Sequence, residues 1–156
     1  MAARDGDGWI ECHCASKHWG KHGAAGLLMI HNRKIFLQHR APWVHNGDTW
    51  GIPGGARDSH ESAQEAAFRE AVEETGLDTS GLQVIGDFVD DHTIWSYTTI
   101  FAVAPSELAT PALNDESHDV RWVDLDDVTR LPLHPSFERS WLEIRRALEV
   151  AIENSI

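Results

Sequence analysis

The sequence is poor in cysteine and has neither a long apolar run nor a secretory signal. Two cysteines among 156 residues, and a first stretch without an apolar signal-peptide core, predict a cytoplasmic protein. No apolar run reaches the roughly 20 residues that a transmembrane helix needs, so we expect no association with a membrane. Repeats, low-complexity segments and linkers are also absent, which favours one folded domain.

Positive charge is scarce, because 13 Lys and Arg residues stand against 25 Asp and Glu residues for a net charge of −12. An acidic surface repels nucleic acid, so we expect no nucleic-acid partner. It also repels a polyphosphate unless metal ions neutralise the charge. The 42% hydrophobic content supports a folded core. We divide the chain into an N-terminal arm (residues 1–22) and a single domain (residues 23–156), and leave open whether it forms a homodimer.

The stretch 50–77, WGIPGGARDSHESAQEAAFREAVEETGL, concentrates acidic residues in a predicted helix. At about 100° per residue, Glu70, Glu73 and Glu74 share one helical face. Three carboxylates on one face repel each other unless a cation lies beside them. Mg²⁺ prefers such oxygen ligands. For the helix alone, a solvated acidic face is the simpler interpretation.

The flanks predict how this helix ends and packs. Asp58 and Glu61, three residues apart, are typical of a capping box, and Gly76 is typical of a left-handed helix end. Phe68 and Val72 lie opposite the acidic face and are expected to anchor the helix in the core.

The complete spacing resembles the Nudix box, the signature of the Nudix hydrolase family. At roughly 7% usage each, seven fixed identities match by chance about once in 10⁸ start positions. Only Ala71 departs, where the family has a larger aliphatic residue, and this position concerns packing. The resemblance extends over about residues 23–150. The matching positions are Gly55, Glu61, Arg69, Glu70, Glu73, Glu74 and Gly76, with the aliphatic Leu77 after them.

The resemblance implies a hydrolase that cleaves a diphosphate linkage in a nucleoside diphosphate derivative with the help of Mg²⁺ or Mn²⁺. Glu70 and Glu74 would hold one metal ion and Glu73 a second, and the carbonyl of Gly55 would join them. Gly54 and Glu61 are supporting residues. Arg69 is expected to fix the carboxylates, with Glu61 as its partner.

The general base and the substrate remain open in the sequence. Glu116, on the polar loop 105–119, is our candidate for a metal ligand or base, while Asp115 or a box glutamate could take the role. Subgroup markers for other Nudix substrates are not found, so a MutT-like enzyme is favoured. It would convert a nucleoside triphosphate, including an oxidised one, to the monophosphate and pyrophosphate. The alternative is a non-catalytic Nudix module that binds a nucleotide as a sensor or interaction domain, although every charged box position is present.

Hydrophobic patterns around the box predict the remaining elements. Strands on both sides of a buried helix, with a second helix at the end, predict an α+β fold: an α/β/α sandwich with a central mixed β-sheet. This is also the Nudix fold. The expected strands are 24–31, 34–40, 82–91, 93–104 and 120–123. A short helix is expected to begin at 124–128, and a C-terminal helix is expected to cover 138–154.

Two further groups of residues are candidate sites. The loop before the box, with its flanks, predicts a substrate pocket lined by Arg40, Trp43, His45, Asn46 and Trp50. The alternative is that these residues belong to an ordinary surface loop and have no role in binding. In the N-terminal arm, two cysteines and two histidines within eleven residues could bind Zn²⁺ tetrahedrally, although their spacing is tighter than in a zinc finger. These residues are Cys12, Cys14, His18 and His22.

Overall fold

A computed structural model describes residues 4–12, 14, 17–110 and 113–156. The chain forms, in order, β1 (Trp9–Glu11), β2 (Lys17–Trp19), β3 (Ala24–His31), β4 (Lys34–Arg40), β5 (Trp50–Gly51), β6 (Gly54–Ala56), α1 (Ala63–Thr75), β7 (Gln83–Asp91), β8 (Ser96–Val103), β9 (Ser117–Asp124), a 3₁₀ turn (Val128–Arg130) and α2 (Pro135–Asn154).

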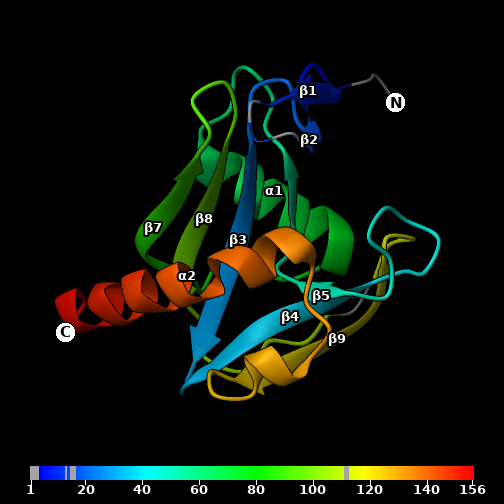
Figure 1. Cartoon of the computed structure of the whole chain (residues 1–156). Helices are drawn as coiled ribbons and strands as arrows, with labels where there is room; N and C mark the ends of the chain where they lie inside the picture. The colour runs from blue at the N-terminus through cyan, green and yellow to red at the C-terminus, as the bar shows by residue number, and fades with distance from the viewer. Residues whose placement is uncertain (1–3, 13, 15–16, 111–112) are drawn as a thin grey trace.

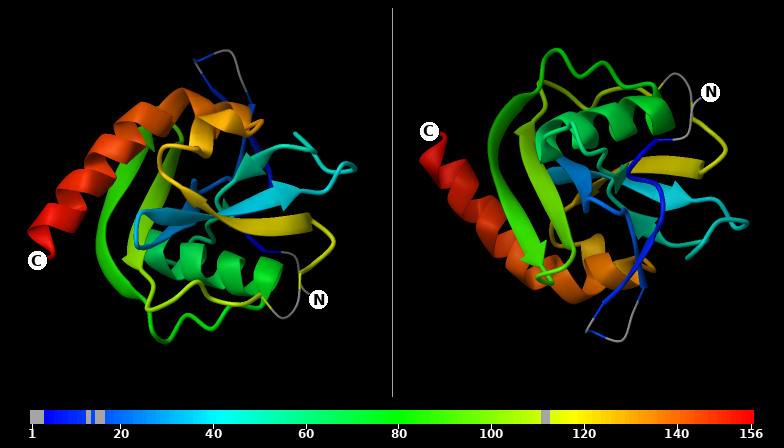
Figure 2. Two further views of the ribbon diagram at one scale, coloured as in Figure 1. Left: turned by 90° about the horizontal axis from the view of Figure 1, so that it is seen from below. Right: turned by 90° about the horizontal axis from the view of Figure 1, so that it is seen from above.

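The main sheet is mixed and lies between the two helices (Figures 1 and 2). Its strand order is β5-β4-β3-β8-β7, with β6 paired to β3 and β9 paired to β4. The β3–β8 pair is parallel and the other pairs of this sheet are antiparallel. The predicted α+β fold, with helices on both faces of a central mixed sheet, is confirmed.

Strand β3 shows why its sequence is a continuous apolar run. Ala25, Leu27 and Met29 belong to the core beneath α1. Leu28 and Ile30 belong to the core beneath α2. Because successive side chains point to opposite faces, a strand covered on both faces must be apolar at every position.

Most predicted elements are present, but several bounds differ. β8 begins at Ser96 and not at 93, and β9 begins at Ser117, three residues before the predicted 120. The predicted helix start at 124–128 is wrong, because β9 continues to Asp124 and only a 3₁₀ turn follows. Helix α2 begins at Pro135, since proline fits the first helical position, where its missing N–H costs nothing.

The capping of α1 also differs from the prediction. The N-cap is Ser62, which accepts a hydrogen bond from the Glu65 N–H while the Glu65 side chain accepts one from the Ser62 N–H. Glu61 does accept from the Asp58 N–H at 3.0 Å, but this bond shapes the loop before the helix. The C-terminal prediction is confirmed, since Gly76 has φ of 70°.

The buried face of α1 is made of alanines and not of the residues opposite the acids. Ala66, Ala67 and Ala71 are fully buried, whereas Val72 is 43% exposed. Phe68 packs at the margin of the same core. Small residues bring the helix close to the sheet, and this close approach also buries part of the acidic face.

The N-terminal arm forms structure of its own. Strands β1 and β2 pair as a hairpin in a separate two-stranded sheet, with Trp9 opposite Trp19. Before the hairpin, Arg4 and the Gly6 N–H bind the buried Asp58 carboxylate at 3.2 and 3.1 Å.

Within the described ranges, neither helix is long and apolar enough to cross a membrane.

Candidate active site

Arg69 organises the carboxylates of the box. Its Nε and Nη2 donate to the two carboxylate oxygens of Glu61 at 2.7 and 2.8 Å, and Nη1 donates to Glu70 at 2.9 Å. Nη2 also reaches the Ala56 carbonyl at 3.0 Å. The bond from Arg69 lowers the pKa of Glu61 to about 2. The expected Arg69–Glu61 pair is therefore present, and its fork geometry fixes both side chains.

Glu74 is the most unusual carboxylate of the chain. Its side chain is buried, at 3% exposure, and no described residue donates a hydrogen bond to its Oε2. Burial raises the pKa of Glu74 well above its ordinary value, and the charges of Glu70 and Glu116 raise it further. A hydrogen bond with the Gln38 side chain offsets only part of this rise. A buried carboxylate oxygen without a partner is unfavourable unless a proton or a cation joins it. The position therefore fits a cation ligand.

Glu70 lies against the backbone of β6. A Cβ atom at Gly55 would lie 2.6 Å from the Glu70 carboxyl carbon, so any larger residue there would displace the Glu70 carboxylate from this position. Burial raises the pKa of Glu70, and Arg69 offsets only part of the rise. Gly54 and Gly55 line the cleft described below.

Glu73 is more open than its neighbours. Its side chain is 41% exposed and forms ion pairs with Arg4 and, at 3.5 Å, with Arg69. Glu73 already forms ion pairs with two arginines, whereas no described residue forms an ion pair with Glu74. The two are therefore not equivalent, although both belong to the box.

One cleft of about 720 Å³ collects most of these side chains. We call Gly55, Glu70, Glu73, Glu74 and Glu116 the acidic set. All of them except the buried Glu74 line the cleft, including Glu116, which comes from the loop before β9. The structure thus brings the loop glutamate to the box.

An aromatic set, Trp9, Trp19 and Trp95, lines the same cleft. Trp9 and Trp19 meet edge to face at 5.3 Å between ring centroids, and the Trp95 indole N–H donates to the Trp19 carbonyl at 3.3 Å. These residues were missed in the sequence, where residues 1–22 were expected to lie outside the core. The count of seven tryptophans was the one available signal.

The predicted substrate residues divide into two groups. Arg40, His45 and Asn46 line the cleft. Trp43 and Trp50 are not among the described residues that line it. Trp43 is 71% exposed and donates to the Asp115 carbonyl at 3.1 Å. Trp50 is a core residue because its strand packs beneath α2, and Arg121 covers its ring at 4.9 Å.

His134 was not predicted, although it lines the cleft beside Asn46, with 3.2 Å between its Nε2 and the Asn46 amide nitrogen. Burial lowers the pKa of His134 to about 4, and the nearby charge of Arg40 contributes. The imidazole is therefore neutral near pH 7.

Comparisons with known proteins agree with this geometry. A family model described as the NUDIX domain matches residues 20–143. The chain belongs to the Nudix hydrolase family. A Mycobacterium tuberculosis Nudix relative that carries the provisional name 8-oxo-dGTP diphosphatase 3 is 46% identical over 154 residues, covering 92% of this chain and 70% of the relative.

Solved Nudix structures share the fold. The crystal structure of the Nudix hydrolase RenU from M. smegmatis has a TM-score of 0.84 and 43% identity, and the match covers 93% of this chain and 96% of that one. A bifunctional NMN adenylyltransferase/ADP ribose pyrophosphatase from Francisella tularensis, solved with AMP and a Mn ion, has a TM-score of 0.65 at 20% identity. That match covers 81% of this chain and 42% of the other.

Nudix enzymes use divalent metal ions, and the acidic set of this Nudix chain fits one. The donors are hard oxygen atoms, two of the carboxylates are raised in pKa by burial, and one buried oxygen has no described partner. A cation would lower the raised pKa values and give the buried oxygen a partner, because an opposite charge stabilises the ionised form of a carboxylate.

Proposed function

We propose that this chain is a Mg²⁺- or Mn²⁺-dependent enzyme that hydrolyses a nucleoside triphosphate to the monophosphate and pyrophosphate. The supporting observation is the buried Glu74 carboxylate, whose Oε2 has no described partner, behind a cleft that Glu70 and Glu116 line. The cytoplasmic location stays a prediction.

Glu70 and Glu74, with the Gly55 carbonyl, would hold one divalent ion, and Glu73 would hold or bridge a second. When bound, the metal ions neutralise the phosphates and lower the pKa of the attacking water. Arg69 is a positioning residue, because its bond to Glu61 fixes its own side chain and its bond to Glu70 orients a carboxylate that would hold an ion.

Glu116 accepts the proton from the attacking water in this proposal. It is exposed, lines the cleft and lies near enough to Glu70 and Glu74 for its charge to raise the pKa of both. Asp115 is the alternative on the same loop, but its residue is not among the described ones that line the cleft.

The substrate would enter with its phosphates towards the acidic set and its base towards the aromatic set. Arg40 and Arg139 also line the cleft and can bind phosphate oxygens. Tryptophan rings stack on nucleobases. The names of the M. tuberculosis relative and of a Proteus vulgaris relative, 8-oxo-dGTP diphosphatase, favour an oxidised purine nucleotide.

A substrate screen tests the proposal. Purified protein with Mg²⁺ or Mn²⁺ is incubated with nucleoside tri- and diphosphates, 8-oxo-dGTP, nucleotide sugars and dinucleotides, and products are separated by anion exchange. We expect monophosphate and pyrophosphate from triphosphates, with Glu74→Gln as the inactive control. Preferred hydrolysis of a nucleotide sugar or a dinucleotide would overturn the substrate assignment. Tight nucleotide binding without turnover would support the non-catalytic Nudix module.

A further inference from the structure

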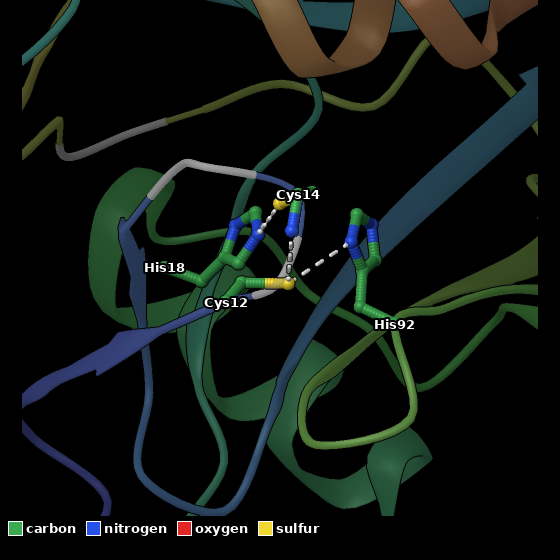
Figure 3. Close-up of side chains that lie close together, drawn as sticks. All are labelled: Cys12, Cys14, His18 and His92. Carbon is green, nitrogen blue, oxygen red and sulfur yellow. Dashed lines mark hydrogen bonds between the residues drawn. The ribbon is translucent and has the colours of Figure 1, made fainter.

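Four metal-ligating side chains converge at the tip of the N-terminal hairpin (Figure 3). Cys12 and Cys14 lie in the turn between β1 and β2, and His18 lies on β2. His92 comes from the turn between β7 and β8, far away in the sequence. One atom from each residue, the Sγ of each cysteine and a ring nitrogen of each histidine, lies within 4.8 Å of all the others.

The distances fit a shared ion. Cys12 Sγ lies 3.5 Å from His92 Nδ1, and Cys14 Sγ lies 3.1 Å from His18 Nε2. In a tetrahedron with Zn–S of about 2.3 Å and Zn–N of about 2.1 Å, neighbouring sulfur and nitrogen ligands lie roughly 3.6 Å apart. Two thiolates and two imidazoles select Zn²⁺ over the hard ions that carboxylates prefer.

Surrounding contacts orient both histidines. His92 Nε2 lies 3.1 Å from the Asp90 carboxylate while its Nδ1 faces Cys12. A carboxylate on the second nitrogen is the usual partner of a zinc-bound imidazole, because it fixes the tautomer and the ring plane. The His18 ring stacks on Trp95 at 4.0 Å between centroids.

We propose that Cys12, Cys14, His18 and His92 bind one structural Zn²⁺ that fastens the N-terminal hairpin to the β7–β8 turn. The sequence-based prediction named His22 as the fourth ligand, but His22 lies beside Asp5, at 4.0 Å between Nε2 and the carboxylate. Its replacement by His92 makes the site a bridge between two distant segments.

The hairpin is attached to the domain through contacts such as the bond from the Trp95 indole to the Trp19 carbonyl, and a zinc ion would strengthen that attachment. Its strands have three residues each and form a separate sheet, and isolated two-stranded hairpins are marginal in water. A structural zinc ion supplies binding energy that becomes folding energy. Because Trp19 and Trp95 lie next to the cluster on its two segments, the ion would also fix the aromatic set over the cleft.

Zinc content tests the site directly. Protein purified without chelators is analysed for metals beside Cys12→Ser/Cys14→Ser, His92→Asn and His22→Asn. We expect about one equivalent of zinc in the parent and in His22→Asn, and less than about a tenth in the double cysteine variant. His92→Asn should bind zinc more weakly. Retention of zinc by the double cysteine variant would overturn the ligand set.

Metal lost during purification would make the zinc content misleadingly low. Protein freed of metal by a chelator is therefore titrated with Zn²⁺ in competition with a chromophoric chelator, which measures its zinc affinity. A parent protein that binds no Zn²⁺ with higher affinity than the double cysteine variant would also overturn the proposal. Repeating the titration in the Glu74→Gln background separates this site from the acidic set, since the cluster's equivalent should remain. With Co²⁺ in place of zinc, thiolate charge-transfer and tetrahedral d–d bands are expected, and they should vanish in the double cysteine variant.

A kinetic readout links the ion to the cleft and rests on the proposed function. Zinc removal should raise KM for the nucleotide at least about fivefold with kcat nearly unchanged, because one stacked base contributes about 1–3 kcal/mol. An unchanged KM with confirmed zinc binding would overturn the link to the aromatic set. An inactive parent that binds zinc would count against the proposed function alone.

Discussion

The acidic and aromatic sets line one cleft but are held in different ways. Four members of the acidic set lie between Gly55 and Glu74 on adjoining elements, and Arg69 bonds the carboxylates of Glu70 and Glu73. The aromatic set comes from a separate hairpin and a turn, and Trp9 and Trp19 are 51% and 43% exposed. In this chain most groups proposed for chemistry come from one helix and the strand beside it, and those proposed for base recognition come from a small separate sheet and a turn. Mutations should therefore separate kcat from KM.

The largest effect is expected from Glu74→Gln. The change keeps the side-chain volume and removes an anionic ligand, so kcat should fall by more than about 100-fold, since second-shell partners alone cost about 10–100-fold. Thermal unfolding of the metal-free variant should show no loss of stability, because the buried charge is gone. Steady-state kinetics with saturating Mg²⁺ check the first expectation. Parent-like turnover on every substrate would show that the metal site is wrongly assigned.

Glu116→Gln tests whether the loop residue belongs with the chemistry. A general base acts in the transition state, so kcat should fall by about 10²-fold or more while KM changes little. Asp115→Asn on the same loop is the matched control. A raised KM with intact kcat would make Glu116 a substrate contact and move the base to Glu70 or Glu73.

Trp19→Ala tests the aromatic set. Unlike Glu116→Gln, it should change KM and leave kcat nearly the same. Loss of one stacking ring is expected to raise KM about fivefold or more and to leave kcat nearly unchanged. Trp43→Ala is the control, since that ring is 71% exposed and does not line the cleft. Equal effects of the two substitutions would remove the distinction between the sets.

The smallest effect concerns stability and pH. The folded pKa of Glu74 is raised above its ordinary 4.5, so between the two values the folded state binds more protons and stability falls as pH rises. His134, with a folded pKa of about 4, acts in the opposite direction below its ordinary 6.5. Because both proteins contain His134, its contribution cancels when the Tm of the metal-free parent is compared with the Tm of Glu74→Gln. This difference in Tm is the measurement. From about pH 5 to about pH 8 the parent should lose a few °C against the variant, and Mg²⁺ should restore it.

Prediction from sequence succeeded where the determinants are local. The spacing from Gly55 to Gly76 fixes which carboxylates share a helical face, and the apolar runs fix β3 and β4 to the residue. It failed where partners are distant. His92 meets Cys12 across 80 residues, and no periodicity of either segment encodes that contact. Trp43 and Trp50 were indistinguishable in the sequence because burial depends on what packs over each ring.

The central position of β3 has a consequence for folding. One edge of β3 pairs with β8, whose Tyr97 lies opposite Ala24, and the other edge pairs with β6 and β4. Closing a loop of roughly 70 residues is slow compared with forming the local β7–β8 hairpin. During synthesis, this edge of β3 therefore stays unpaired until β8 has left the ribosome. A nascent chain stopped before residue 96 would offer this strand to chaperones.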